Sequence, residues 1–532
     1  MSRKAKPAQE NKFDAVPPAA ADHLRKLWYR EAIIFLGTFI FFYIFADMGI
    51  DPHHDGVMLI PAIRVAQGGM VFKDVFCQYG LLVPLIQGLA VAIFGEELLV
   101  IRLVTVLFYG GCAILLDLLW RRFLPAKISW LVPVLFALLS PATMVTFHSW
   151  SSVYALFFML LSGFFLLRYL EDHKWGRWNL FAAGSAAILT WGCRTPCGAV
   201  TVFAAILVLA GLNLFTGKTW KTLLQEWFSY AAGCALIALP ALACIIFTGA
   251  WDDFIKQNFG YVADFVQQRG DGGEIGSWQY FCDSMLPFFQ DDFLYCHTFF
   301  ALMPLGAIAL LYIHCRKGII AGKEEMKKIL PLTALLILGL GSWHQYYPVP
   351  CVRHLFWGGA PLFGAYILII VELWKFKKNI TGKVAAIFMG LFLLLAIYPR
   401  ITGGYIRLLT KSSRKTLDVS GIRGIKLSNS ERNLIRQIRN TVENDPLKER
   451  GVVNWSEDSL LTLTMPGSGF HDVQFYRFDN NQYPDYDQKI LRHIEEKRPF
   501  VLVDHPIIIP GYKPVLHLNN KGKEYMLLRP EE

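Results

Sequence analysis

The chain has 532 residues, of which 54% are hydrophobic and 14% aromatic, and its mean hydropathy is +0.37. This composition excludes an ordinary soluble globular protein and indicates a polytopic membrane protein. The formal net charge of +10 does not indicate a nucleic-acid partner. The lysines and arginines are concentrated in short loops between apolar runs, and they form no single binding stripe.

The first 400 residues contain a series of apolar runs long enough to cross a hydrocarbon core. A polar and basic tail, residues 1–30, precedes them; we expect it in the cytoplasm, without a cleaved signal peptide. The length that a bilayer requires predicts about eleven transmembrane helices, at residues 31–49, 98–120, 128–147, 151–170, 179–193, 197–215, 228–249, 297–315, 329–347, 355–374 and 384–399. The predicted transmembrane domain is therefore 31–400.

The distribution of charge among the loops predicts the topology. Lysine and arginine are frequent in alternate loops, which we assign to the cytoplasm. With this assignment the apolar run 81–95, LLVPLIQGLAVAIFG, cannot cross the membrane, because a crossing would invert every later loop. The run is short and contains Pro84, so we expect a helix at the outer interface. The large outer loops are then 50–97 and 250–296.

Residues 401–532 have the character of a small α/β soluble domain. Apolar residues at helical spacing predict helices at 431–444 and 486–498, and GVVNW, FVLVD and EYMLL predict short strands. An odd number of spans places this domain outside the cytoplasm, whereas the basic residues just after the last span favour the cytoplasm. We expect the extracytoplasmic side.

The segment MGIDPHHDGVML, residues 48–59, carries two carboxylates and two histidines where the first span reaches the outer face. Asp55 is either a functional group or the N-cap of the amphipathic helix that follows. Asp51 before Pro52 favours a turn. Asp51, His53, His54 and Asp55 are also candidate ligands for a divalent metal. Adjacent histidines in an extended segment point in opposite directions, so this indication is weak.

Further polar residues lie at the outer ends of later segments. Lys73 and Asp74 are consistent with a solvated pair, and Tyr79 is consistent with an interfacial aromatic residue. Arg194 lies between two apolar spans and requires a carboxylate or a phosphate as its partner; an internal salt bridge and a bidentate phosphate contact explain it equally well. The remaining candidates at this face are His148, Tyr347, Arg353 and His354. Together these groups suit an anionic, partly lipidic substrate that enters from the membrane.

The first outer loop carries a specific series of motifs. They are Asp55-Gly56 opening a juxtamembrane helix, Gln78-Tyr79-Gly80, Pro84, Phe94-Gly95 and then IRLVTVLFYGG…LLDLLWRRF at 101–123. In these motifs the sequence resembles the GT-C superfamily of integral-membrane glycosyltransferases, most closely the family 39-like branch of dolichyl-phosphate-mannose and aminoarabinose transferases. The resemblance covers the membrane region evenly and the final domain loosely. It implies a polytopic α-helical membrane protein with a small C-terminal α/β domain.

The resemblance also implies roles for individual residues. Asp55 matches the catalytic base of the family, and Arg194 matches the residue that contacts the donor phosphate, with Lys73 or Arg353 assisting. The predicted substrate-binding residues are Asp51, His54, Tyr79, His148, Tyr347 and His354. Many relatives carry an acidic residue at the outer end of the third or fourth span, where this chain has FHSWSSVY. Either His148 substitutes for it, or no metal is bound there.

The implied reaction moves a sugar from a polyprenyl-phosphate-linked donor to the hydroxyl of a glycan, lipid or protein acceptor, with inversion. Its expected place is the periplasmic face of a bacterial inner membrane. A phosphate leaves without protonation, so one carboxylate suffices. Two alternatives stay open: a transporter or flippase of a lipid-linked glycan, disfavoured because the polar residues lie at span ends and no repeat is visible, and a non-catalytic envelope scaffold. The only cofactor left open is a divalent metal.

Overall fold

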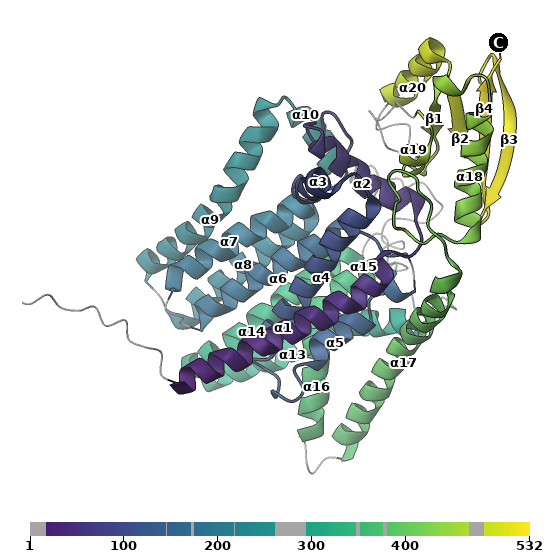
Figure 1. Cartoon of the computed structure of the whole chain (residues 1–532). Coiled ribbons are helices and arrows are strands. Elements are labelled where there is room, and N and C mark those ends of the chain that lie inside the picture. Colours follow the sequence, from purple (N-terminus) through teal and green to yellow (C-terminus); the bar gives the residue numbers. More distant parts are fainter. Residues whose placement is uncertain are drawn as a thin grey trace, which may run out of the picture.

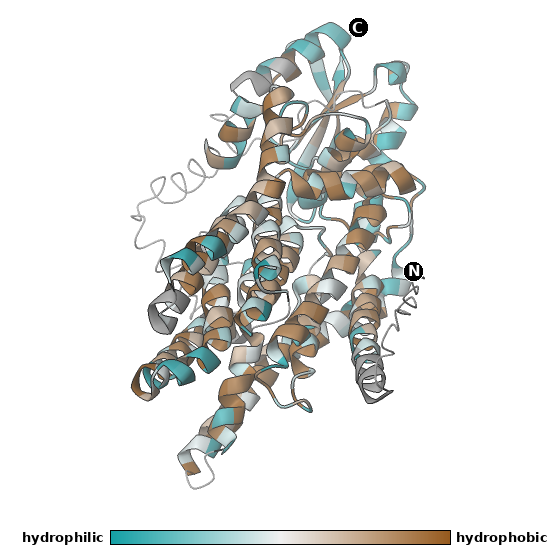
Figure 2. Cartoon of the chain, turned by 90° about the vertical axis from the view of Figure 1, so that its left-hand side faces the viewer, coloured by the Kyte–Doolittle hydropathy of each residue, from teal (hydrophilic) through white to brown (hydrophobic). Residues whose placement is uncertain are grey.

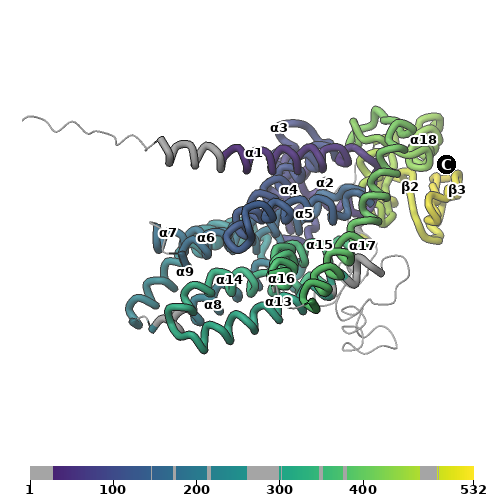
Figure 3. Tube along the Cα trace, turned by 90° about the horizontal axis from the view of Figure 1, so that it is seen from below, coloured from purple at the N-terminus to yellow at the C-terminus, as the bar shows by residue number. Residues whose placement is uncertain are grey.

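The computed structural model of the protein describes residues 18–144, 146–171, 175–217, 219–260, 294–346, 352–375, 380–467 and 484–531. Figures 1 and 3 show the helices of the first 400 residues running side by side as a bundle, with a sheet-containing domain at one end. The predicted site residue Tyr347 and most of the predicted 250–296 loop lie outside the described residues.

The helices of the bundle and of its connecting loops are α1 (Pro18–Ala46), α2 (Pro52–Ala66), α3 (Leu82–Phe94), α4 (Leu98–Trp120), α5 (Leu131–Leu138), α6 (Ser151–Leu170), α7 (Gly176–Cys193), α8 (Thr195–Thr216), α9 (Trp220–Phe247), α10 (Trp251–Ile255), α13 (Leu294–Ala321), α14 (Lys323–Ser342), α15 (Val352–Gly359), α16 (Phe363–Lys375) and α17 (Ile380–Thr410). Short 3₁₀ turns occur at Pro141–Thr143, Trp343–Tyr346, Ala360–Leu362 and Lys411–Ser413, and a π-helical turn at Lys256–Gly260.

Within the described residues, eight helical segments are long and apolar enough to cross a membrane. They are Trp28–Ala46, Leu98–Trp120, Ser151–Leu170, Trp220–Phe247, Leu302–Ala321, Lys323–Tyr346, Val352–Lys375 and Ile380–Ser413. The other three predicted spans correspond to α5, α7 and α8. α5 has only 8 residues, because Ser140 and Pro141 begin a 3₁₀ turn shortly after it. α7 carries Arg177 and Asn179 among small residues, which lowers its apolarity.

The hydropathy of the surface follows this architecture. Figure 2 shows hydrophobic residues along the length of the bundle helices, whereas hydrophilic residues gather in the domain at the top and at the lower helix ends. Large apolar side chains such as Phe228, Phe247 and Phe388 are exposed on the bundle. Such a surface suits a lipid environment, in which apolar side chains need no burial inside the protein.

Two short helices lie across the end of the bundle that faces the sheet domain (Figure 1). The first is α2, and the second is α3, which has 13 residues and is too short for an ordinary crossing. α3 is the helix predicted at 81–95, and it packs against α2. The 50–97 loop is therefore a compact helical cover over this end of the bundle.

The C-terminal domain combines a four-stranded sheet with flanking helices. Its elements are α18 (Asn429–Glu443), the 3₁₀ turn Lys448–Arg450, β1 (Val452–Trp455), α19 (Leu461–Thr464), α20 (Pro484–Lys497), β2 (Phe500–Val503), β3 (Tyr512–Asn520) and β4 (Lys523–Pro530). The strand order is β1-β2-β4-β3; β1 and β2 are parallel, and β4 is antiparallel to both of its neighbours. Val452 pairs with Phe500 and Val501 with Leu528.

The helical and strand patterns of the sequence explain this domain. A capping box between Ser428 and Glu431 begins α18, and the helix buries Leu434, Ile435 and Ile438 at helical spacing. Every residue of β2 is buried, as expected of an inner strand whose two faces are both covered. The predicted helices and strands are present, and β3 completes the sheet.

The domain docks on the same end of the bundle as the 50–97 loop. The backbone N–H of Lys426 donates to the carbonyl of Asp47 (2.7 Å), and that of Leu98 to the carbonyl of Gly421 (2.9 Å). The ammonium groups of Lys411 and Lys426 both bind the Asp47 carboxylate, at 3.0 and 2.9 Å. Lys411, one of the basic residues after the last span, thus binds the loop that leaves α1.

Candidate active site

Asp55 lies in the first turn of α2 and is almost completely buried, with 1% of its surface exposed. Its Oδ2 accepts hydrogen bonds from the Arg102 guanidinium (2.8 Å) and from the backbone N–H of Asp51 (2.9 Å). Its Oδ1 is buried and has no hydrogen-bond partner among the described residues. Burial raises the pKa of Asp55 to about 6, although the Arg102 charge opposes the rise. Within the described chain the site therefore holds a carboxylate with one oxygen fixed and the other without a partner.

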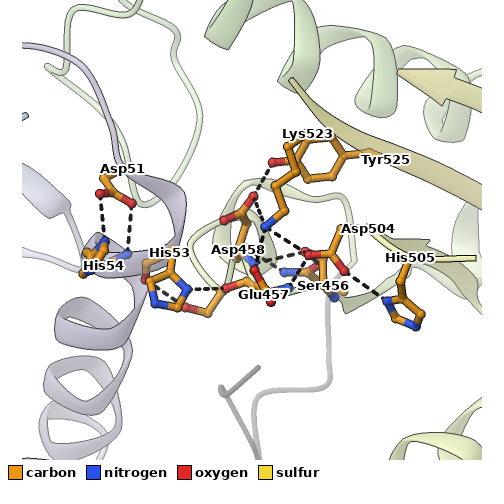
Figure 4. Close-up of polar contacts among 12 residues, drawn as sticks. Asp51, His53, His54, Ser456, Glu457, Asp458, Asp504, His505, Lys523 and Tyr525 are labelled. Atoms are coloured by element: carbon orange, nitrogen blue, oxygen red, sulfur yellow. Dashed lines mark hydrogen bonds and ion pairs between the residues drawn. The ribbon is translucent and has the colours of Figure 1, made fainter. Parts of the chain in front are cut away.

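Asp51, and not Asp55, is the N-cap of α2. Its side chain accepts from the backbone N–H of His54 and also contacts the His54 ring at 2.8 Å (Figure 4). Capping therefore does not account for Asp55, and the simple turn role predicted for Asp51 is incomplete. Burial would raise the pKa of Asp51, but the hydrogen bond and charge of His54 hold it well below its usual range.

His148 connects α2 to a guanidinium from a distant part of the chain. Its Nε2 lies 3.8 Å from Asp51 Oδ2 and 2.9 Å from Arg353 Nη1. Burial and the Arg353 charge lower the pKa of His148 well below its usual value, so the ring is neutral and Nε2 accepts from Arg353.

Trp150 is the centre of the site. The His54 and Tyr79 rings lie 4.9 and 5.5 Å from its ring centroid. The Arg353 guanidinium lies 5.9 Å from the same centroid, and Trp357 stacks behind it at 6.2 Å. This indole thus joins residues of the 50–97 loop to residues of α15.

Arg194, at the junction of α7 and α8, reaches the same cluster through Tyr79. Its guanidinium lies 6.0 Å from the Tyr79 ring centroid and hydrogen-bonds the Ser152 hydroxyl. The neighbouring Gly80 explains the close approach of the two segments, because a Cβ at Gly80 would lie 2.1 Å from the carbonyl oxygen of Gly192. Gly80 therefore lets the Gln78-Tyr79-Gly80 motif pack directly on the segment that carries Arg194.

Most of the residues predicted from the sequence thus form one continuous cluster: Asp51, His54, Asp55, Tyr79, His148, Arg194 and Arg353. His354 lies at its edge, 6.0 Å from the Trp357 ring centroid. Lys73 lies elsewhere, since its ammonium donates to the carbonyl of Thr248 at the end of α9 (2.8 Å). Among the described residues, Lys73 therefore shows no hydrogen bond or ion pair with this cluster.

The candidate metal ligands do not converge. His53 Nδ1 donates to the carbonyl of Glu457, His54 faces Asp51, and Asp55 faces Arg102 (Figure 4 shows the first two contacts). In the described part of the chain, no group of three or more His, Cys, Asp or Glu side chains is arranged to hold a metal ion. As it stands, the arrangement of these four residues does not fit a metal centre.

Sequence reasoning overlooked two residues of the site. Arg102 begins the second span, and its signal was available, because a guanidinium within an apolar helix requires a carboxylate partner. Trp150 lies within FHSWSSVY, and nothing local in the sequence distinguishes it from the other tryptophans. The indole Nε1 of Trp150 and the hydroxyls of its neighbours Ser149 and Ser151 are buried without a hydrogen-bond partner among the described residues.

The apolar helices identify an integral membrane protein, and its overall architecture agrees with the fold that the resemblance to the GT-C superfamily predicts. The crystal structure of ArnT from Cupriavidus metallidurans bound to undecaprenyl phosphate matches 96% of this chain and 98% of its own, with a TM-score of 0.53 and 11% sequence identity. Because the sequence identity is only 11%, this similarity supports a shared fold and nothing about activity.

The archaeal oligosaccharyltransferase AglB from Archaeoglobus fulgidus, in complex with an inhibitory peptide and a dolichol-phosphate, matches 90% of this chain and 70% of its own. Its TM-score is 0.47 and its identity 12%, too low to carry an argument. The sequence matches no protein-family model and no curated protein.

Proposed function

We propose that the protein is a glycosyltransferase that moves a sugar from a polyprenyl-phosphate-linked donor to an acceptor hydroxyl, with Asp55 as general base. The observation that carries this proposal is the Asp55 carboxylate, whose Oδ2 is fixed by Arg102 while its buried Oδ1 has no partner in the described chain. The GT-C fold and the undecaprenyl phosphate bound to ArnT support a lipid-linked donor.

Asp55 has the properties that a base requires. Its pKa of about 6 leaves the carboxylate ionised at neutral pH and makes it a stronger base than an exposed aspartate. In the proposed step the acceptor oxygen forms a bond to the anomeric carbon, and its proton passes to Asp55 Oδ1. The bond from that carbon to the phosphate oxygen breaks at the same time, so direct attack inverts the anomeric configuration.

Arg194 and Arg353 are suited to the phosphate that leaves. In the described chain neither guanidinium has a carboxylate partner; they contact Ser152 and His148, respectively. At the opposite end of the bundle, by contrast, Arg30 and Arg121 bind Asp117 and Glu31. Arg194 lies over the Tyr79 ring and Arg353 over the neighbouring Trp150 ring, and two guanidinium groups with no carboxylate partner in the described chain favour an anionic ligand.

The sugar would lie between the base and these cations. Ser149, Trp150 and Ser151 present buried polar atoms that lack a hydrogen-bond partner within the described chain, and buried polar groups are normally satisfied. The hydroxyl groups of a bound sugar would satisfy them, and an aromatic ring gives the sugar an apolar surface. Asp51, His54, Tyr79, His148 and His354 complete the proposed substrate-binding surface.

The proposed location is the outer, periplasmic face of a bacterial inner membrane. The excess of basic residues in the loops at the other end of the bundle supports it, and the C-terminal domain shares the end that carries the candidate site. The acceptor is a hydroxyl group of a glycan, lipid or protein. A divalent metal is not required by the proposed chemistry, because the two guanidinium groups neutralise the phosphate.

The test uses membrane vesicles that contain the full-length protein and a panel of radiolabelled undecaprenyl-phosphate-linked sugars. We expect transfer of the label, with release of undecaprenyl phosphate, and a loss of roughly 100-fold or more in the Asp55→Asn variant. The exposed Asp74→Asn is the matched control and should retain activity. Label that crosses the membrane without release of undecaprenyl phosphate would identify a transporter, and full activity in Asp55→Asn at normal expression would reject the mechanism.

A further inference from the structure

A turn of the C-terminal domain lies directly on the first turn of α2. The segment 457–460 follows β1, and three of its hydrogen bonds reach α2. Leu460 N donates to the carbonyl of Pro52 (2.9 Å), the Ser459 hydroxyl donates to the carbonyl of His53 (3.5 Å), and His53 Nδ1 donates to the carbonyl of Glu457 (3.0 Å). Two of these bonds thus end on the carbonyls of Pro52 and His53, in the helical turn that carries Asp55.

Gly56 makes this close approach possible. A Cβ at this position would lie 2.2 Å from the Ser459 hydroxyl oxygen and 2.3 Å from the backbone nitrogen of Leu460. The second of these atoms belongs to the backbone and cannot rotate away, so a side chain here would displace the turn. The glycine that follows Asp55 in the sequence is therefore explained by a contact between the two domains.

On the side of the turn away from α2, the ammonium group of Lys523 binds three carboxylates (Figure 4). Lys523, at the start of β4, lies 3.2 Å from carboxylate oxygens of both Glu457 and Asp458 and 3.0 Å from Asp504, which follows β2. Asp504 also accepts from the backbone N–H of Glu457 (2.8 Å), and Tyr525 donates to Asp458.

This charge arrangement stabilises the turn only while Lys523 is present. Three carboxylates around one ammonium repel one another when the cation is removed. Burial would lower the pKa of Lys523, but its carboxylate neighbours raise it, so the ammonium stays charged across the working range of pH. Glu457 and Asp458 would separate from Asp504 without it.

We propose that Lys523 is a positioning residue for Asp55, an inference that rests on the proposed function. Lys523 holds the 457–460 turn against α2, and the turn fixes the helical turn from which Asp55 projects and excludes water from it. The C-terminal domain thereby becomes part of the catalytic unit, although none of its residues touches the reacting atoms.

The pKa of Asp55 reports how well water is excluded from its carboxylate. In the described chain the charged and titratable groups around Asp55 are Arg102 on α4, Asp51, His53 and His54 on the same turn, and His148 beyond Asp51. None of these belongs to the C-terminal domain, so displacing the 457–460 turn changes the solvation of Asp55 and not its charged neighbours. Since burial is the largest cause of the raised pKa of Asp55, displacement should lower it towards its ordinary value.

The experiment measures transfer by the full-length protein as a function of pH with an undecaprenyl-phosphate-linked sugar that the wild type accepts. For Lys523→Met we expect kcat to fall roughly 10- to 100-fold with a smaller change in KM for the donor. In the wild type, activity should fall at acid pH as Asp55 takes up a proton (the acid limb of the pH profile); in Lys523→Met we expect this fall to occur at lower pH. The control is Lys513→Met on β3, an exposed lysine for which the described chain shows no ion pair, and Lys523→Arg should restore most of kcat.

Gly56→Ala tests the same contact from the α2 side and should reproduce both effects. If Lys523→Met only reduced the amount of folded protein, activity would fall equally at every pH and the acid limb would stay in place, which would overturn the inference. An unchanged kcat in Lys523→Met would also overturn it. The proposed function fails separately, through activity that persists in Asp55→Asn.

Discussion

Arg102 and Asp55 form an ion pair of 2.8 Å in which neither side chain is accessible to solvent. The guanidinium comes from the start of α4 and the carboxylate from the first turn of α2, and Arg102 also donates to the carbonyl of Ala46 at the end of α1 (2.9 Å). One side chain thus ties together α1, α2 and α4 at the point where the candidate base lies. The pair orients Asp55 by occupying one of its two oxygens.

Replacing Arg102 by Met should inactivate the protein and destabilise it. The substitution leaves a buried carboxylate without its cation, which costs about 3–5 kcal/mol for a buried pair, and Asp55 would respond by taking up a proton. We expect transfer at pH 7 to fall by roughly 100-fold and thermal stability in detergent to decrease.

Arg102→Lys separates the two effects. A lysine keeps the positive charge but cannot supply the fixed geometry of the guanidinium, so this variant should recover stability more fully than activity. If Arg102→Met retained both wild-type stability and wild-type transfer, the pair would have no role in holding the base.

The activity should have an acid limb near pH 6. Because burial raises the pKa of Asp55 from 3.8 to about 6, the carboxylate is protonated below pH 6 in the folded protein, and the rate should fall about tenfold per pH unit there. The effect on stability has the opposite sign: since the folded pKa exceeds the unfolded one, Asp55 favours folding most below pH 3.8, and this contribution is lost as the pH rises through about 6.

Initial rates between pH 5 and 8 with saturating donor would measure the limb. The residual activity of Asp55→Asn should lack it, whereas Asp74→Asn should keep the wild-type profile. A limb that persists unchanged in Asp55→Asn would assign the titration to another group.

The sequence and the structure agree where the information is local. Hydropathy and loop charge are properties of short segments, so they located α3 at Leu82–Phe94 and the start of α2 beside Asp55. The sequence does not identify Asp51 as the cap, because either carboxylate of DPHHD suits the first turn, and only the backbone geometry separates them. The contact of His53 with Glu457 joins residues 404 positions apart, and no periodicity or motif encodes such a pair.

Arg194 and Lys73 should differ sharply as phosphate ligands. Arg194 has no carboxylate partner in the described chain and reaches the Trp150 cluster through Tyr79, whereas Lys73 binds the carbonyl of Thr248 away from it. Removing a cation that stabilises a departing phosphate costs about 100- to 1,000-fold in kcat by analogy with other electrostatic contacts of this kind.

We therefore expect a loss of that order for Arg194→Ala, a smaller loss for Arg353→Ala, and a change of less than about twofold for Lys73→Ala. Steady-state kinetics with an undecaprenyl-phosphate-linked sugar, at constant ionic strength, would rank the three. An equal loss in Lys73→Ala and Arg194→Ala would mean that the phosphate lies outside the Trp150 cluster.

A side chain at Gly80 should impair activity by displacing part of the candidate site. A Cβ there would lie 2.1 Å from the carbonyl oxygen of Gly192, so Gly80→Ala must push the Gln78-Tyr79-Gly80 segment away from Arg194. We expect kcat/KM to fall roughly tenfold or more while the bundle stays folded. Gly37→Ala is the control, since a Cβ at Gly37 meets nothing within 4 Å.

A double-mutant cycle then assigns the effect to Tyr79. If Gly80→Ala acts by displacing the Tyr79 ring from the Arg194 guanidinium, the loss in Tyr79→Leu and the loss in Gly80→Ala should not add in the double variant, because the first substitution already removes what the second displaces. Fully additive losses would show that Gly80 supports the site through another contact.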